Sequence, residues 1–330
     1  YTIRSTWSNS TGSYKAIMIQ ASSNPPTVSA KLNVPIAVSY CSDLELDASN
    51  SEGGYSREIK FAWRVEASPS NSDLSSFVRQ WETPSSSSVI TIPAKYFEAL
   101  VSVFYQVTVS NVFGVSDSKS ATTSIKQQPI PYVYFQGGNS FTFPGSSDLA
   151  VALAVRVPSC MAVPEDYAFS WSLVKTDFGG KVDMGSLRAA APNERTFVYS
   201  PGLLESGYSY TFKVSVTPLG SSDSAEAQLD LTLKPSQPRA VVSGCDRVAS
   251  AYKPLVISGK DSYDPDNPKT VLSFSWSCSP GLCSGEGSSL NVESLKADIT
   301  YTFTLKVSKK SLSSSSSCYI KTTASDVPVL

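Results

Sequence analysis

The stretch Leu272-Ser273-Phe274-Ser275-Trp276-Ser277-Cys278 alternates apolar with small polar side chains. This period of two is typical of a β-strand that has one face on a core and the other in water. Its centre, an aromatic residue, a small residue and tryptophan, occurs twice more, at Phe61-Ala62-Trp63 and at Phe169-Ser170-Trp171. The three tryptophans are spaced by 108 and 105 residues, so the sequence repeats one structural unit.

A second strand pattern, a tyrosine followed by alternating apolar residues, begins at Tyr105, Tyr210 and Tyr301. Each copy follows one of the tryptophan strands. This is the order of an immunoglobulin-like sandwich, where tryptophan fills strand C and tyrosine lies near the start of strand F. The sequence therefore predicts an all-β fold of tandem antiparallel β-sandwiches, immunoglobulin-like or fibronectin-III-like. The residues expected in the cores are Trp63, Trp171, Trp276, Tyr105, Tyr210 and Tyr301.

Proline-bearing segments divide the repeat into units. We expect β-sandwiches over residues 28–128, 129–236 and 237–330, joined by stiff proline-containing linkers. The tyrosine pattern also opens the sequence at Tyr1-Thr2-Ile3, which indicates that residues 1–27 are the final hairpin strands of a truncated upstream sandwich. We therefore expect a segment of a longer chain.

The composition narrows the classes of function. The sequence has 27 Lys and Arg against 28 Asp and Glu, a formal charge of -1, so it has no strong field that would gather nucleic acid. It has no apolar run of membrane-spanning length, so we expect no direct membrane insertion by this segment. It contains no histidine, which excludes Ser-His-Asp and Cys-His catalysis from this chain alone. We expect a non-catalytic protein.

The six cysteines form no CxxC pair, a pattern that favours structural disulfides in an oxidising, extracellular compartment over a zinc or redox site. The short spacing of Cys278 and Cys283 can close a small loop at the end of a strand. Cys245 opens the third unit and Cys318 lies on its predicted last strand, and the first and last strands of sandwiches often adjoin. Cys41 and Cys160 then remain as a third pair, although six cysteines allow fifteen connectivities.

One loop of the third unit brings together Asp261, Asp264 and Asp266, with Asn267 adding an amide oxygen. Such hard oxygen ligands suit Ca²⁺, which takes six to eight of them. The same residue types also form turns in which their side chains bond the neighbouring backbone. Both interpretations stay open, and no other cofactor is expected.

The residues from Leu255 to Pro268, followed by Leu272 to Cys278, closely resemble the "receptor for egg jelly" (REJ) module of polycystin-1-like proteins, and more distantly the polycystic kidney disease (PKD) domain. Both families carry a strand, an Asp-Pro-Asp turn and an aromatic-x-Trp strand. The first repeat has a partial copy at residues 46–51, and the second repeat keeps only the tryptophan and tyrosine strands. The resemblance implies several fibronectin-III-like sandwiches in series.

These observations together predict a cell-surface segment, with a ciliary surface as one setting, that acts in adhesion, tethering or as a mechanical or signalling stalk. Its expected partners are other extracellular proteins or glycans, within a larger chain or assembly, contacted through loops such as Ala67–Pro84 and Lys175–Arg195. Asn9 in Asn-Ser-Thr is a predicted N-glycosylation site. Two other functions stay open: a structural subunit of an extracellular or ciliary filament, and an accessory array of a secreted hydrolase.

Overall fold

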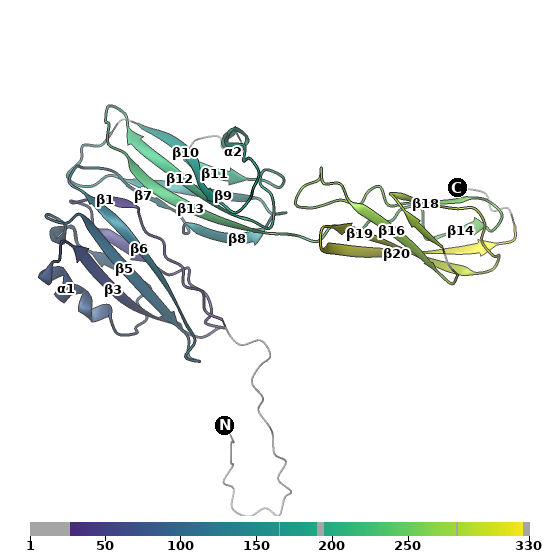
Figure 1. The fold of residues 1–330 in the computed structure, drawn as a ribbon, viewed down its shortest axis with the longest axis horizontal. Coiled ribbons are helices and arrows are strands. Elements are labelled where there is room, and N and C mark those ends of the chain that lie inside the picture. The colour runs from purple at the N-terminus through teal and green to yellow at the C-terminus, as the bar shows by residue number, and fades with distance from the viewer. Residues whose placement is uncertain (1–26, 165, 190–194, 282, 326–330) are drawn as a thin grey trace, which may run out of the picture. The chain divides into compact units, whose positions relative to one another are not determined.

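The computed structural model describes residues 27–164, 166–189, 195–281 and 283–325 (Figure 1). The predicted hairpin over 1–27 and the glycosylation site at Asn9 lie outside these residues, apart from residue 27. The chain divides into two compact units, residues 1–34 with 40–127 and residues 35–39 with 128–330. The predicted all-β fold is confirmed, since paired strands make up both units.

In the first unit, β3 (Lys60–Ser68) pairs antiparallel with β5 (Ser102–Ser110), and β5 pairs antiparallel with β6 (Ser116–Lys126). A second antiparallel pair joins β2 (Leu44–Asp47) to β4 (Val89–Ile92). Burial alternates along these strands, because successive side chains of a strand point to opposite faces. The inward faces form the apolar core of the unit.

The segment Ala67–Pro84, expected to be a loop, contains helix α1 (Ser72–Val78) and the short 3-10 helix η1 (Arg79–Trp81). Asn71 caps α1, because its side chain accepts hydrogen bonds from the backbone N–H groups of Asp73 and Leu74. Leu74 and Val78, one turn apart, are buried and fix the helix to the unit. A further 3-10 helix, η2 (Ala94–Tyr96), follows β4.

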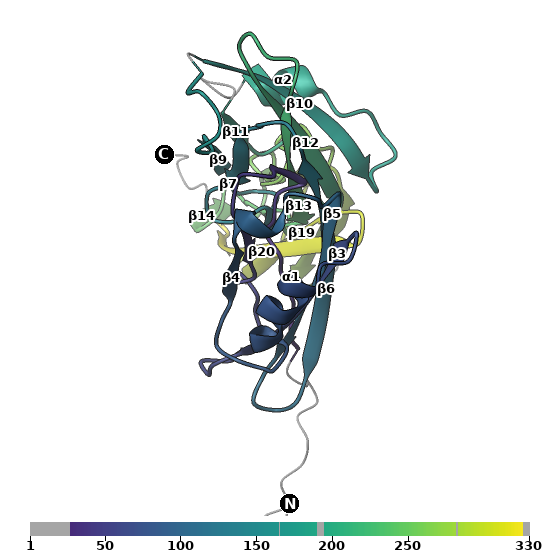
Figure 2. The same ribbon diagram turned by 90° about the vertical axis from the view of Figure 1, so that its left-hand side faces the viewer.

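The second unit contains two sandwiches, each with its own core. In the first of them, called the second sandwich here, one sheet has the order β10-β12-β13-β8 and the other has the order β11-β9-β7. Helix α2 (Met184–Ala189) lies against β10 and β11 (Figure 2). The strands are β7 (Tyr132–Phe135), β8 (Ser140–Pro144), β9 (Leu149–Arg156), β10 (Tyr167–Thr176), β11 (Thr196–Tyr199), β12 (Ser209–Pro218) and β13 (Ala225–Lys234).

The third sandwich has one sheet in the order β14-β20-β19-β16-β17 and a two-stranded sheet of β15 and β18. Its neighbouring strands are antiparallel, except that β14 runs parallel to β20. The strands are β14 (Arg247–Ser250), β15 (Leu255–Ser258), β16 (Ser273–Ser279), β17 (Ser284–Glu286), β18 (Ser289–Val292), β19 (Thr300–Lys309) and β20 (Leu312–Thr323).

Residues 35–39, which include β1 (Ala37–Ser39), group with the second unit. The physical reason is packing, since Ala37 belongs to the buried apolar cluster around Trp171. The predicted limits of the three sandwiches, 28–128, 129–236 and 237–330, stay predictions.

The three repeated tryptophans are all buried, with Trp63, Trp171 and Trp276 exposing 1%, 8% and 2% of their surface. The indole N–H of Trp63 donates to the carbonyl of Ser87, and that of Trp276 donates to the carbonyl of Gly287, each at 3.0 Å. These bonds satisfy the one polar atom that a buried indole brings into a core.

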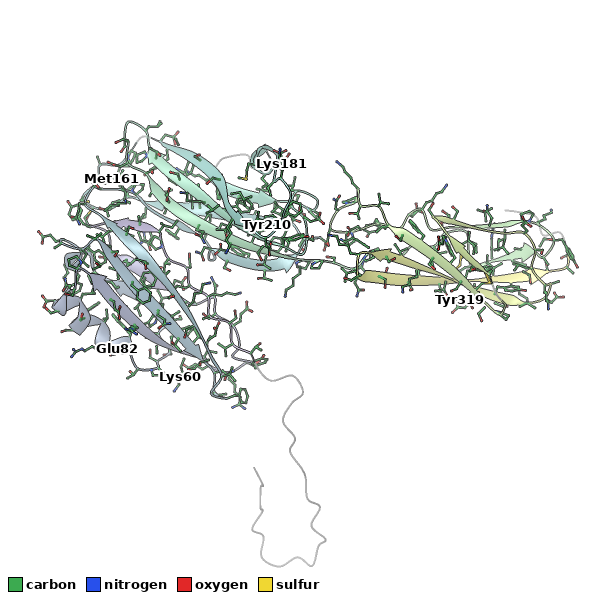
Figure 3. The ribbon with its side chains drawn as sticks, viewed as in Figure 1. Lys60, Glu82, Met161, Lys181, Tyr210 and Tyr319 are labelled. Carbon is green, nitrogen blue, oxygen red and sulfur yellow. A yellow bond between two sulfur atoms is a disulfide. The ribbon has the colours of Figure 1, made fainter. Side chains whose placement is uncertain are left out.

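The repeated tyrosines Tyr105, Tyr210 and Tyr301 are buried as well. Tyr210, labelled among the strands of the second sandwich in Figure 3, donates its hydroxyl to the carbonyl of Glu205 at 2.9 Å. The hydroxyl of Tyr301 instead accepts from the backbone N–H of Lys296 at 3.1 Å. In both sandwiches the tyrosine therefore ties the start of its strand to the preceding loop, as in a tyrosine corner.

Candidate functional site

The Asp-Pro-Asp loop lies between β15 and β16 and contains two buried carboxylates. Asp264 and Asp266 expose 1% and 2% of their surface, whereas Asp261 is exposed and Asn267 is half-buried. The backbone N–H of Asp266 donates to Oδ1 of Asp264 at 3.1 Å, so part of the loop is a turn held by its own side chain. The structure therefore separates Asp261 from the other two acids by burial.

A lysine that the sequence analysis did not identify neutralises part of this charge. Nζ of Lys309, at the end of β19, lies 2.6 Å from Oδ2 of Asp264 and 3.3 Å from Oδ2 of Asp266. The backbone N–H of Ser236 donates to Oδ2 of Asp266 at 2.7 Å. A charged residue closing a strand is ordinary in sequence, so nothing in the sequence marked Lys309 as the partner of a loop more than forty positions away.

Two buried oxygens near this cluster have no hydrogen-bond partner among the described residues: Oδ1 of Asp266 and Oγ of Ser206. Both lie within 3.2 Å of the point where a Cβ would stand on Gly145, at 3.2 Å and 1.8 Å respectively. Any side chain at Gly145 would collide with Ser206. Glycine fits here because it has no Cβ, whose place is filled by the side chain of Ser206.

Asp266 and Ser206 are among the residues that line a cavity of about 40 Å³, although the two unpartnered oxygens themselves are closed to solvent. Its size suits a small guest such as a water molecule or an ion. It is lined by Leu204, Glu205, Ser206, Asp264, Asp266, Asn267, Thr270, Lys309 and Lys310. The lining thus combines the loop between β11 and β12, the Asp-Pro-Asp loop and the end of β19.

Opposite charges also meet at the rim of the cavity. Nζ of Lys310 lies 3.1 Å from Oε1 of Glu205 and 5.9 Å from the centre of the Tyr208 ring. The hydrogen bond that Lys310 donates to the Glu205 carboxylate raises the pKa of Lys310. Burial, and then the charge of Asp266, raise the pKa of the Tyr199 phenol. The Asp266 carboxylate therefore disfavours the ionised form of Tyr199. The hydroxyl of Tyr199 donates to the carbonyl of Gly145 at 2.7 Å.

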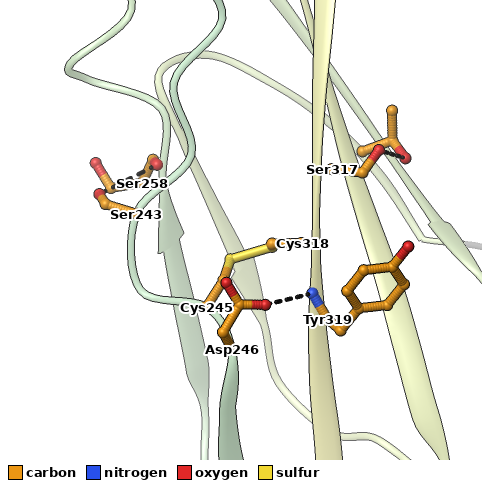
Figure 4. The surroundings of a disulfide bond; sticks show 8 residues. Ser243, Cys245, Asp246, Ser258, Ser317, Cys318 and Tyr319 are labelled. Atoms are coloured by element: carbon orange, nitrogen blue, oxygen red, sulfur yellow. Dashed lines mark hydrogen bonds between the residues drawn. A yellow bond between two sulfur atoms is a disulfide. The ribbon is translucent and has the colours of Figure 1, made fainter.

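The third sandwich contains two disulfides. Cys245 is bonded to Cys318 on β20, across 73 positions, and Figure 4 shows this bridge beside Asp246 and Tyr319. Next to it, the N–H of Asp246 donates to the carbonyl of Tyr319 at 2.9 Å. Cys278 is bonded to Cys283, five positions away. Cys41 and Cys160 are disulfide-bonded too.

Across residues 27–325, apart from the gaps given above, no group of three or more His, Cys, Asp or Glu side chains is arranged to hold a metal ion. In the same part of the chain, no helix is long and apolar enough to cross a membrane. Metal coordination here would therefore need oxygens from other residue types.

Comparison with protein-family models gives matches to the REJ domain over residues 35–238 and 155–330. The chain belongs to the REJ domain family. The loop of Asp264 and Asp266 and the Cys245–Cys318 bridge both lie in the second matched stretch of this REJ segment. A comparison with curated proteins gives no match.

Several solved structures of tandem immunoglobulin domains are similar to the REJ segment at low identity. The insect immune protein hemolin is 12% identical over 89% of this chain and 76% of that chain, with a TM-score of 0.38. The four N-terminal immunoglobulin domains of Dscam1 isoform 7.44 are 12% identical over 89% of this chain and 72% of that chain, with a TM-score of 0.37. Sidekick-1 immunoglobulin domains 1–4 are 12% identical over 89% of this chain and 76% of that chain, with a TM-score of 0.31. The sandwich fold itself rests on the strand pairing described above.

Family membership and the disulfide-bonded cysteines indicate that this REJ segment is extracellular. Disulfides persist in oxidising compartments and are rare in the cytosol.

Proposed function

We propose that the chain is a non-catalytic extracellular segment of a polycystin-1-like cell-surface protein that bears load between other extracellular parts, as an adhesive or tethering stalk. The match to the REJ domain over residues 35–330 carries this proposal. Sandwiches in series suit such a role, because each has a core of its own and can resist force separately. Its partners are other extracellular proteins or glycans.

The second sandwich supports the load-bearing role through its strand pairing. β8, near its start, runs parallel to β13, its last strand, with Phe141 opposite Leu231 and Phe143 opposite Leu233. Tension on the chain ends pulls two such neighbouring strands along their length in opposite directions. The backbone hydrogen bonds between them are then loaded together instead of one after another, which favours a high unfolding force.

The third sandwich carries tension covalently. Cys245 precedes β14 and Cys318 lies on β20, so the bridge between them bypasses the residues that they enclose. Force entering at Cys245 leaves through Cys318, and most of the sandwich stays unloaded. The second sandwich thus resists unfolding under tension through its backbone hydrogen bonds, and the third resists it through a disulfide.

Single-molecule stretching of the whole chain tests this proposal. The second sandwich should give a distinct unfolding peak, whereas the oxidised third sandwich should give no long extension. Cys245→Ala with Cys318→Ala should add a step of about 25 nm, at ~3.5 Å for each of the 73 enclosed positions. Cys278→Ala with Cys283→Ala is the matched control, because this loop lies inside the bypass and its loss should add no step.

A second measurement tests the proposed absence of catalysis and the proposed adhesive role. Purified chain is assayed on generic peptide and glycoside substrates. Its binding to extracellular extracts is compared with that of variants in which exposed residues of segment 67–84 are replaced and the buried Leu74 and Val78 of α1 are kept. Absence of turnover together with reduced binding is expected. Unfolding of the second sandwich without a measurable force peak, or turnover that follows the chain through purification, would refute the proposal.

A further inference from the structure

The Asp-Pro-Asp loop contacts the segment that joins the second sandwich to the third, and this segment is very short. Lys234 is the last residue of β13, and its carbonyl accepts the backbone N–H of Gly145 at 2.9 Å, which fixes it to the second sandwich. Ser236 donates its backbone N–H to Oδ2 of Asp266 at 2.7 Å, which fixes it to the third. Only Pro235 lies between them, and its ring restricts φ. The linker therefore has almost no free length.

The chain stays bound to the third sandwich after this point. Pro238 is buried. Arg239 exchanges two backbone hydrogen bonds with Tyr263, at 2.8 Å and 3.1 Å. The backbone N–H of Ala240 donates to Oγ of Ser314 at 3.0 Å. The path from β13 into the third sandwich is thus anchored at most of its residues, unlike a flexible linker, whose backbone samples many conformations.

Two contacts beside the linker hold the sandwiches together at further points. Oγ of Ser236 lies 3.0 Å from Oγ of Ser146, in the loop after β8. Nζ of Lys310, just after β19, lies 3.1 Å from Oε1 of Glu205, in the loop between β11 and β12. Two separate loops of the second sandwich therefore restrict rotation about the linker.

Lys309 allows the acidic loop to be buried at this joint. Its Nζ lies 2.6 Å from Oδ2 of Asp264 and 3.3 Å from Oδ2 of Asp266. A buried carboxylate needs such a partner, because taking a charge out of water is costly. The carboxylate of Asp266 is thereby held where it accepts from Ser236, and its other oxygen lies against Gly145. The charge cluster of the third sandwich thus contacts both the linker and the second sandwich.

We propose that the Asp-Pro-Asp loop is a docking element that fixes the third sandwich rigidly to the second, so that the two move as one body in solution. Asp266 is the positioning residue of this joint, Lys309 is its counter-charge, and the pair of Glu205 and Lys310 is a brace beside it. Each sandwich keeps a core of its own, so rigid docking is compatible with separate unfolding. The inference does not depend on the proposed function, because the joint is rigid without load.

The distribution of distances between the two sandwiches tests this inference in the whole chain. Spin labels on unnatural amino acids, which leave the disulfides intact, replace Val174 on β10 and Tyr319 on β20 (Figure 4), each 57% exposed. Pulsed electron paramagnetic resonance then measures how widely the joint moves. One narrow distance peak is expected. A broad distribution would overturn the proposal, because it would show a free hinge.

Three substitutions should replace the narrow peak by a broad distribution. Pro235→Gly frees the one linker residue without touching either core. Asp266→Ala removes the acceptor of the Ser236 N–H, while Asp264 still pairs with Lys309, so the charges of the third sandwich stay balanced. Lys310→Glu places like charges beside each other at the brace.

A charge swap and a matched control keep the test decisive. Adding Glu205→Lys to Lys310→Glu restores opposite charges and should restore the narrow peak, which a folding defect would not do. Asp261→Asn removes an exposed acid of the same loop and should leave the peak unchanged.

Thermal unfolding shows whether each variant folds. An unchanged distribution in folded Asp266→Ala, or a broad one in Asp261→Asn, would overturn the proposal. If Asp266→Ala does not fold, the charge swap decides: an unchanged peak in Lys310→Glu, or no recovery in the double variant, would refute the docking role.

Discussion

The second and third sandwiches share the same repeated strands but are stabilised differently. Among the described residues, the buried apolar cluster of the second contains twenty, including Trp171, Phe197 and Phe212, whereas that of the third contains eleven. The third sandwich has two internal disulfides. The predicted range of the second, 129–236, contains a single cysteine and so has none of its own.

This difference shows how one fold can be stabilised by two routes. A small core supplies little stability after chain entropy is subtracted, so small extracellular domains often add disulfides. The aromatic clustering of the second sandwich, where Trp171 packs on Phe197 and Phe197 on Phe212, makes a disulfide within this sandwich unnecessary. Four measurements on the whole chain test whether the two sandwiches are stabilised in these different ways.

Truncation of the central tryptophans should have the largest effect. Trp171→Ala and Trp276→Ala should each cost about 3–5 kcal/mol, because each leaves a large cavity in a packed core. Calorimetry should show one transition lowered by Trp171→Ala and a different one lowered by Trp276→Ala. A single transition that moves with both variants would mean that the two sandwiches unfold together and that the comparison fails.

Loss of the long disulfide should affect only the third sandwich. Cys245→Ala with Cys318→Ala should lower its unfolding free energy by about 4 kcal/mol, since the bridge no longer restricts the unfolded chain. Thermal unfolding with and without reductant gives the measurement. An unchanged transition would contradict the view that the smaller core depends on this bridge.

Loss of the short disulfide should cost less. The bridge between Cys278 and Cys283 closes only a short loop, with a separation of five positions. By the same chain-entropy argument, Cys278→Ala with Cys283→Ala should lower the unfolding free energy by about 2 kcal/mol. Denaturant titration resolves the two variants. A cost equal to that of the long bridge would show that enclosed chain length does not decide the contribution.

The smallest expected effect is the alkaline response of the second sandwich. Burial raises the pKa of Tyr210 to about 12, above its ordinary value near 10. The unfolded state therefore loses the phenolic proton first, so the stability is complete below pH 10 and decreases between pH 10 and 12. Tyr210→Phe should flatten this decrease in thermal unfolding scans over that pH range. An identical pH profile in the variant would show that Tyr210 is not the group involved.

Much of the fold could be predicted from the sequence, because a strand that lies on a core alternates its side chains and the alternation is visible in residue order. The tryptophan and tyrosine patterns fall on β3, β10 and β16 and on β5, β12 and β19. Helix α1 was missed, since a cap at Asn71 and one apolar pair are a weak signal inside a polar segment.

The sequence alone determined the all-β class, the period of the repeat, the absence of histidine chemistry and the REJ resemblance, because all of these depend on residue type and near spacing. It also identified the acidic loop, yet treated Asp261, Asp264, Asp266 and Asn267 as equivalent. The tertiary structure alone shows that Asp264 and Asp266 are buried against Lys309, and that Gly145 lies against Ser206 and Asp266. These residues are separated by up to 164 positions, and their meeting depends on how loops from different strands converge, which local patterns do not encode.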